Sequence, residues 1–539
     1  MSTLTRVFQA NGEAIYPIGG QTQNSSGYNA REFTHAFDAL DTLHGNTLEV
    51  PVYWEQIEPE EGAYDFSSVD ALVAHARQRD VHLILLWFGT WKNGNMEYAP
   101  DWVKTDPDRF KRVISPAGLP LWVLSSYCEA TFEADRAAFC ALCRHLRETD
   151  GTRGTVLALQ IENEPGILGS DRDYGADAEA VFTDDVPEAL MAKVREADSG
   201  PLFELWQHVG EREGTWARVF GPDAGEIMTA WSIARTIDRI AEAGKAVYDI
   251  PMYLNVWLGE NGWRIPGESY PSGGAVTKVL DLYTWATPHV DLIAPDIYIA
   301  DAAGYAGICE TYARADNPLF VPESAPGGSN AWNLFRAVAD YDAIGYFLFA
   351  IERILDDEGQ IRPGAQQLVD SFRALAAAAP LLLEYQGTGR IHAVVQEENL
   401  GAQVFEFEGY DGMVQFGVGP MPRAGKDWRH PSASIPVPAS IRTQRGRGLI
   451  VQTGRHEFYL VGADYRLFLR PKRAPKAALD AQYTNDRLRT RLAHYVQVDE
   501  GHFETDGTFV VDRRRNGDET DHGLWVEPDV GVVHVVLCP

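Results

Sequence analysis

Two glutamates lie near the ends of apolar segments, where charged side chains are unusual. Glu164 follows the run LALQIEN, and Glu323 follows LFVP, 323 − 164 = 159 residues later. Two carboxyls that meet across a cleft can cleave a glycosidic bond, one protonating the leaving oxygen while the other attacks the anomeric carbon. A separation of about 5 to 5.5 Å would mean retention of configuration. Their repulsion splits the two pKa values, so one group stays protonated at neutral pH.

The pattern of predicted helices and strands indicates a fold that would bring these two glutamates together. Up to about residue 380, short apolar runs alternate with helical patterns, which is typical of a parallel sheet wound with helices. Eight strands close a (β/α)8, or TIM, barrel, whose catalytic groups lie at the carboxyl ends of the strands. Glu164 would end the fourth strand and Glu323 the seventh, so both would lie at one mouth of the barrel. The predicted strands are 15–20, 47–53, 81–88, 156–164, 251–257, 292–298, 319–323 and 344–351.

The segments between the strands carry apolar residues at helical spacing. One such helix is predicted behind the N-cap candidates Ser67 and Ser68. The connection after the fourth strand is long, and its stretch 169–185 is rich in Asp and Gly. We expect that stretch to be an elaborated loop on the catalytic face.

Beyond the helical run 366–379, the pattern changes to short alternating segments. Asp411-Gly412, Asp506-Gly507 and Asn516-Gly517 separate these segments, and such dipeptides suit tight hairpin turns. We therefore expect a catalytic barrel over residues 1–380 and a β-sandwich, packed directly on it, over residues 381–539. The predicted sandwich strands are 404–407, 449–452, 458–461, 467–469 and 532–537.

Charge and composition narrow the class of protein. The chain has 77 acidic and 47 basic side chains, a net charge of −30, which disfavours nucleic acid and anionic membranes and is compatible with a neutral sugar. No apolar run approaches the roughly 20 residues of a membrane span, and the N-terminus shows no secretory pattern, so a cytoplasmic protein is expected. Cys140 and Cys143 share one face of a predicted helix and are interpreted as buried small apolar residues.

The motif around Glu164 resembles that of a known family. The run 160–164, Gln-Ile-Glu-Asn-Glu, is similar to the Q-[VI]-E-N-E motif of glycoside hydrolase family 35, the β-galactosidase family of the large (β/α)8 glycosidase clan. The resemblance implies that Glu164 is the acid/base, Glu323 the nucleophile and Asn163 a ligand of the sugar 2-hydroxyl. VPVYWEQIEPEEGAYDFSSVD resembles the second-strand region of that family. LLWFGTWKNGNMEYAPDWVK and RRRNGDETDHG resemble a bacterial subgroup with a small C-terminal β domain, some members of which release galactose from xyloglucan.

Further positions follow or end predicted strands and are candidates for substrate binding. In the clan a tyrosine hydroxyl usually contacts the nucleophile, and the resemblance assigns this role to Tyr298. Tryptophans at strand ends either stack on a sugar or pack in the core, and the acidic candidates either bind hydroxyls or neutralise basic neighbours. The candidates besides Asn163 are Gln21, Glu55, Trp91, Glu162, Trp257, Tyr298 and Glu352.

The sequence indicates the type of reaction more clearly than it indicates which sugar is released. Many members of family 35 carry Cys-Ala-Glu-Trp after the third strand, with a glutamate that holds galactose, where this chain has Phe-Gly-Thr-Trp at 88–91. The expected function is a retaining exo-β-glycosidase that releases terminal β-linked galactose from neutral oligosaccharides without a metal or organic cofactor. Two alternatives stay open: the chain could be a β-glucosidase or transglycosylase that acts on short β-glucans, or a protein that binds sugars without turnover. A homodimer is also a possible assembly.

Other enzyme classes lack their sequence signatures. A metal-dependent barrel hydrolase needs His and carboxylate ligands at strand ends, and His456-Glu457 has no second His four residues on. No GxSxG elbow occurs, and Ser324 adjoins a Pro-Glu pair instead. Gly327-Gly328-Ser329 is a weak candidate for a phosphate loop and more often indicates a flexible connection.

Overall fold

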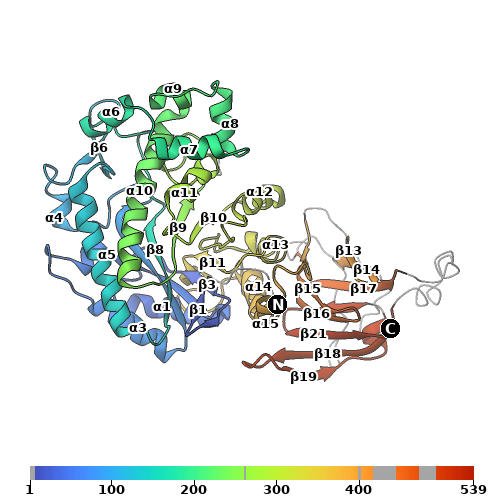
Figure 1. Ribbon diagram of the computed structural model, residues 1–539. Helices are drawn as coiled ribbons and strands as arrows, with labels where there is room; N and C mark the ends of the chain where they lie inside the picture. The colour runs from blue at the N-terminus through green and yellow to red at the C-terminus, as the bar shows by residue number, and fades with distance from the viewer. Residues whose placement is uncertain (1–6, 260–262, 398–401, 417–444, 473–492, 522) are drawn as a thin grey trace.

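The first part of the molecule is a parallel sheet wrapped by helices (Figure 1). The computed structural model describes residues 7–259, 263–397, 402–416, 445–472, 493–521 and 523–539. Seven parallel strands form the sheet in the order β10-β9-β8-β5-β4-β3-β11. They are β3 (Ile18–Gln21), β4 (Thr47–Tyr53), β5 (His82–Lys92), β8 (Val156–Asn163), β9 (Met252–Trp257), β10 (Leu292–Asp296) and β11 (Tyr346–Phe349).

The eighth position of the barrel is filled by residues 319–324, between β10 and β11. Ile297 N–H donates to the Glu323 carbonyl at 2.9 Å, and Phe347 N–H donates to the Val321 carbonyl at 2.8 Å. Isolated parallel bridges therefore join this segment to both neighbours and close the ring. The predicted seventh strand is in place but is not a regular strand, because it pairs with its neighbours through isolated bridges and not through a continuous ladder.

Helices cover the outside of the barrel. Their apolar faces share one large core with the outer side of the strands, whereas the barrel interior holds a separate cluster that includes Phe88, Phe320 and Phe347. The prediction that Ser67 or Ser68 caps this helix is wrong, because the helix begins at Ser67 itself and the N-cap residue is Phe66. The main outer helices are α1 (Ala30–Leu43), α3 (Ser67–Gln78), α5 (Glu129–Thr149), α10 (Ala224–Val247), α11 (Leu280–Ala286), α12 (Ala302–Tyr312), α13 (Asn333–Asp340) and α14 (Gln366–Ala377).

The connection from β8 to β9 is a helical excursion. Figure 1 shows its helices α6 (Ala176–Thr183), α7 (Glu188–Glu196), α8 (Pro201–His208) and α9 (Trp216–Phe220) gathered at one end of the barrel. The Asp- and Gly-rich start of this connection is held in place by Asp173, which accepts from Ile114 N–H at 2.9 Å and from the Ser125 hydroxyl at 2.6 Å. Ile114 belongs to a hairpin, β6 (Arg112–Ile114) and β7 (Pro120–Leu124), in the preceding connection. The two connections therefore support one another.

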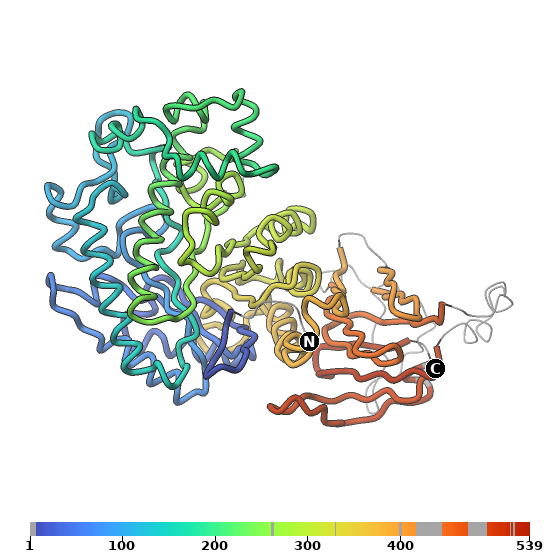
Figure 2. The backbone as a smooth tube through the Cα atoms, in the orientation of Figure 1, coloured from blue at the N-terminus to red at the C-terminus, as the bar shows by residue number. Residues whose placement is uncertain are grey.

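After α14 and α15 (Ala379–Tyr385), the chain forms two antiparallel sheets (Figure 2). Their orders are β12-β15-β16-β21-β18-β19 and β13-β14-β17-β20, and both sheets contribute to one apolar core, as predicted for a sandwich. The strands are β12 (Ile391–Val395), β13 (Ala402–Phe407), β14 (Tyr410–Phe416), β15 (Arg447–Gly454), β16 (Glu457–Ala463), β17 (Tyr465–Pro471), β18 (Tyr495–Phe503), β19 (Phe509–Arg514), β20 (Leu524–Val526) and β21 (Val532–Leu537).

The predicted turn dipeptides have different outcomes. Asp506-Gly507 joins β18 to β19, and Gly507 has a positive φ of 80°. Asp411-Gly412 lies inside β14 instead. A Cβ at position 412 would come within 2.4 Å of the Phe407 ring, so the glycine makes room for that ring. The turn itself is made by the two residues before Tyr410, of which Gly409 has a φ of 83°. Asn516-Gly517 precedes the short helix α18 (Asp518–Asp521) and not a strand.

The sandwich packs on barrel helices through Arg447, whose side chain is almost completely buried. Its guanidinium donates to the Ser371 hydroxyl at 2.7 Å and to the Gln367 carbonyl at 3.1 Å, both on α14, and pairs with Asp464 at 3.3 Å. The division at residue 380 stays a prediction. Within the described residues, no helix has the length and apolar character needed to cross a membrane. All five cysteines are free, and Cys140 and Cys143 are buried in α5, as predicted.

Candidate active site

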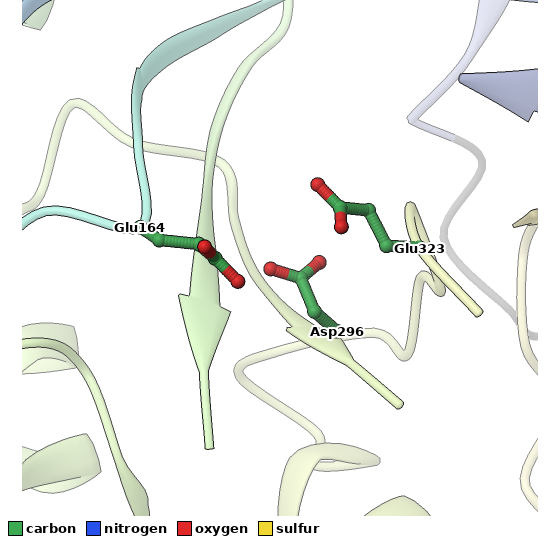
Figure 3. Close-up of side chains that lie close together, drawn as sticks. All are labelled: Glu164, Asp296 and Glu323. Carbon is green, nitrogen blue, oxygen red and sulfur yellow. The ribbon is translucent and has the colours of Figure 1, made fainter. Parts of the chain in front are cut away.

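Three carboxyl groups meet at the carboxyl ends of the barrel strands. Glu164 follows β8, Asp296 ends β10 and Glu323 lies in the segment that closes the barrel. Each offers an oxygen within 4.8 Å of an oxygen of the other two, and all three residues are buried. Figure 3 shows the three side chains pointing toward one another from different segments. The fold thus brings together the two predicted glutamates and adds a third acid that the sequence interpretation missed.

The three carboxyls line a cavity of about 320 Å³. Other walls come from Lys92, which ends β5, from Asn93 after it, from Trp257 at the end of β9, and from Tyr298 and Phe349. Ligand sites of this size are at the small end of the usual range. The cavity therefore suits a small ring-shaped group with polar substituents better than a long chain.

Glu323 is held by donors. The Tyr298 hydroxyl donates to Oε2 at 2.6 Å, and Asn255 Nδ2 lies 3.4 Å from Oε1. Burial and the charge of Glu323 raise the pKa of Tyr298, so its phenol stays protonated and remains a donor. Hydrogen bonds of this kind favour an ionised carboxylate. The contact predicted between Tyr298 and Glu323 is present.

Glu164 has the opposite electrostatic environment. Burial, followed by the charge of Glu323, raises its pKa to about 7, while Lys92 and a hydrogen bond from Asn93 Nδ2 act in the other direction. Its backbone has a φ of 45°, a conformation that non-glycine residues rarely adopt. Asn255 Oδ1 accepts from its N–H at 2.8 Å and fixes this strained position. Glu164 is thus equipped to carry and release a proton near neutral pH.

Asn163 lies beside the acid pair and is fully buried. Its Oδ1 accepts from Lys92 Nζ at 2.7 Å, and its Nδ2 has no hydrogen-bond partner in the described part of the chain. Lys92 also donates to Asn93, so this one cation orients two asparagines next to Glu164.

Glu162 and Trp91 are not among the described residues that line the cavity, so a role for them in binding substrate stays a prediction. Trp91 is 1% exposed and packs in the core, and its backbone N–H donates to Glu162 Oε2 at 2.7 Å. Burial and the neighbouring Asp135 raise the pKa of Glu162 well above its ordinary value. The physical reason for the contact with Trp91 is a bulge in β5, where four residues between Trp87 and Lys92 have only one counterpart on β8 and turn the peptide of Trp91 toward Glu162.

Glu55, Glu352 and Gln21 are not among the described residues that line the cavity either. Glu55 pairs with Lys104 at 2.8 Å and so neutralises a basic neighbour. Glu352 accepts from the Gln23 N–H at 3.1 Å. Gln21 is completely buried, and neither polar atom of its side-chain amide has a partner in the described residues. Of the predicted binding residues, Trp257 and Tyr298 line the cavity directly.

Replacing Glu162 by alanine should lower the free energy of unfolding by about 1–3 kcal/mol, because the buried Trp91 N–H would lose its acceptor. Glu162→Gln should lose much less, since a neutral amide still offers an oxygen to that N–H. Urea unfolding followed by tryptophan fluorescence measures both. Glu242→Ala, on the exposed side of α10, is the control and should stay within about 0.5 kcal/mol of the wild type. Equal losses for Gln and Ala would contradict this role.

Comparisons with known proteins match two separate parts of the chain to two family models. A family model described as Beta-galactosidase (Glyco_hydro_42) matches residues 29–208, and one described as a domain of unknown function (DUF5597) matches residues 368–527. No curated protein matches the chain. The matching glycosidase model is that of family 42, so the predicted membership of family 35 is not supported, while the large (β/α)8 glycosidase clan fits.

Solved structures are similar at low identity. The catalytic domain of a β-amylase from Paenibacillus polymyxa aligns with a TM-score of 0.50 and 12% identity, covering 67% of this chain and 98% of that domain. A β-galactosidase from Bacillus circulans sp. alkalophilus aligns with a TM-score of 0.47 and 14% identity over 68% of this chain, and Gan42B, a GH42 β-galactosidase from G. stearothermophilus, with 0.49 and 16% over 70%. The chain covers only 57% and 58% of these two enzymes. The β-amylase likeness supports the barrel fold.

Proposed function

We propose that this protein is a retaining β-glycosidase that removes a terminal sugar, with β-linked galactose as the first candidate, from neutral oligosaccharides. The observation that carries the proposal is the placement of Glu164 and Glu323, whose carboxyl oxygens lie within 4.8 Å across a small cavity. Inverting enzymes keep their two carboxyls about 6.5 to 9.5 Å apart to admit a water, so the shorter separation supports retention. The family model that matches the first part of the barrel supports galactose.

In the first half of the proposed reaction, Glu164 is the acid and Glu323 the nucleophile. A proton leaves Glu164 for the glycosidic oxygen as the bond to the anomeric carbon breaks, and Glu323 forms the glycosyl ester. The pKa of about 7 allows Glu164 to hold that proton at neutral pH. Tyr298 and Asn255 orient Glu323 for attack.

In the second half, the ionised Glu164 takes a proton from water, which attacks the anomeric carbon and releases Glu323. The unpaired Nδ2 of Asn163 supports a role in binding a hydroxyl of the sugar, because a buried donor without a partner is costly unless a ligand satisfies it. The described residues that line the cavity all belong to the barrel. We therefore assign catalysis to residues 1–380.

The assay that tests this function compares p-nitrophenyl β-galactoside with the matching β-glucoside, each alongside β-linked oligosaccharides of the same sugar. A higher kcat/KM on galactosides is expected. Activity on glucosides or short glucans alone would support the proposed reaction but mean that the sugar is glucose and not galactose. No turnover on any substrate would mean that the protein binds sugars without cleaving them.

Trp257 is expected to bind the sugar by stacking, because it lines the cavity while 37% of its surface is exposed. Trp257→Ala should raise KM about 3- to 10-fold with a smaller change in kcat. Steady-state kinetics on the preferred glycoside measure this. Trp122→Ala is the matched control, since Trp122 is similarly exposed and lies outside the cavity wall. Equal effects of the two changes would show that Trp257 has no such role.

A further inference from the structure

The third carboxyl, Asp296, has no task in a mechanism that needs two. It is 2% exposed at the end of β10, and its nearest oxygens lie within 4.8 Å of both Glu164 and Glu323. A buried acid that contacts two others is costly when all three are ionised. Its protonation state therefore decides the charge of the site.

The proton of Asp296 can be located from the hydrogen bonds of Asn255. Because the Asn255 Oδ1 accepts the Glu164 N–H at 2.8 Å, its Nδ2 must be the side that points at the other acids. That Nδ2 donates to Asp296 Oδ2 at 2.9 Å. Oδ2 is thus an acceptor, and a proton on Asp296 belongs on Oδ1, which accepts no hydrogen bond from the described residues. The carboxyl groups of Asp296 and Glu164 share a hydrogen bond, so this proton is the one that Asp296 can donate to Glu164.

The charges around Asp296 favour its neutral form. Acidic groups reach it from three other segments, namely Glu164, Glu323 and Glu49 of β4, and all of them raise the pKa of Asp296, which burial has already moved well above its ordinary value. Within the described residues that line the cavity, Lys92 is the one cation, and it lies on the Glu164 side, bonded to Asn163. The neighbouring phenols of Tyr253 and Tyr298 are protonated and donate to Glu49 and Glu323.

We propose that Asp296 is a positioning residue that stays protonated through the reaction and donates a hydrogen bond to Glu164 whenever Glu164 is ionised. The inference rests on the proposed function. When Glu164 has given its proton to the leaving oxygen, the Asp296 O–H holds one oxygen of the new carboxylate and leaves the other free to receive a proton from water. No proton is lost by Asp296 in the cycle, so the two steps stay balanced.

Two variants separate this role from a structural one. Asp296→Asn keeps a neutral group that can donate to Glu164, so the alkaline limb of the pH profile of kcat/KM should stay near that of the wild type, and kcat should fall less than about 10-fold. Asp296→Ala removes the donor, which should move that limb to higher pH and slow deglycosylation about 10- to 100-fold. A move of the limb to lower pH in Asp296→Asn would overturn the proposal, because it would mean that a negative charge had been removed.

A spectroscopic measurement tests the same proton without catalysis. At neutral pH, the infrared difference spectrum of the wild type minus Asp296→Asn should contain the carbonyl stretch of a protonated carboxylic acid, because the bands of other protonated acids such as Glu162 cancel in the subtraction. If only carboxylate bands change, Asp296 is ionised and the inference fails, whatever the enzyme assays show. If the carbonyl band is present in a protein that turns over no glycoside, the proposed function fails while the protonated Asp296 stands.

Discussion

Replacing Glu323 by glycine should lower kcat by about 10⁴- to 10⁶-fold, because the covalent intermediate can no longer form. The change also leaves a space beside the anomeric carbon, between Tyr298 and Asn255, that a small anion can enter. Added azide should restore turnover and give a glycosyl azide of inverted configuration. The measurement is the rate with and without azide, with the product identified by NMR.

The control for this variant is Glu60→Gly, at an exposed position that does not line the cavity, which should keep wild-type kcat and show no response to azide. An azide product of retained configuration from Glu323→Gly would mean that Glu323 is the acid/base, and the two roles would have to be exchanged.

Replacing Glu164 by alanine should lower kcat/KM by about 10²- to 10⁴-fold on substrates with poor leaving groups, and much less on a dinitrophenyl glycoside that needs no protonation. Glu164 acts as an acid only while it is protonated, so wild-type kcat/KM should fall as pH rises through about 7. That limb should be absent from Glu164→Ala on the activated substrate. A limb that persists near pH 7 would assign the titration to another group.

Most of the barrel can be predicted from sequence because each strand is a short apolar run bounded by polar residues. The strand predicted at 47–53 is observed over the same residues, and that at 156–164 ends one residue early, at Asn163. The seventh position shows the limit of such patterns, since residues 319–324 have the composition of a strand but form only isolated bridges to their neighbours. Composition predicts where a segment lies better than whether its hydrogen bonds are regular.

The side chains of the site could be predicted less completely than the strands, because their directions depend on local irregularities of the backbone. Glu162 lies two residues from both Gln160 and Glu164, so a regular strand would place all three on one face. The positive φ of Glu162 and the bulge in β5 break that regularity, and the Glu162 carboxyl meets the backbone of Trp91. A bulge of that kind has no short sequence signature. Asp296 could have been found, because it ends an apolar run two residues before Tyr298, by the same criterion that identified Glu323.

The roles of the hydrogen-bond donors Asn255, Lys92 and Asn93, unlike that of Asp296, could not be predicted from the sequence. Each contacts a residue of another strand or loop, so their roles depend on the register between segments that are far apart in the chain. Asn255 in particular bonds to the backbone of Glu164, to Asp296 and toward Glu323, and it is the residue through which three barrel strands hold one geometry.

The measurement that tests the central claim most directly is the configuration of the first sugar released. Hydrolysis of an aryl β-glycoside that the protein accepts is followed by proton NMR at early times, before the anomers of the free sugar equilibrate. If Glu164 and Glu323 act by double displacement, the β-anomer appears first and the α-anomer grows in later by mutarotation. If the α-anomer appears first, the reaction inverts, and the assignment of Glu323 as a covalent nucleophile is wrong.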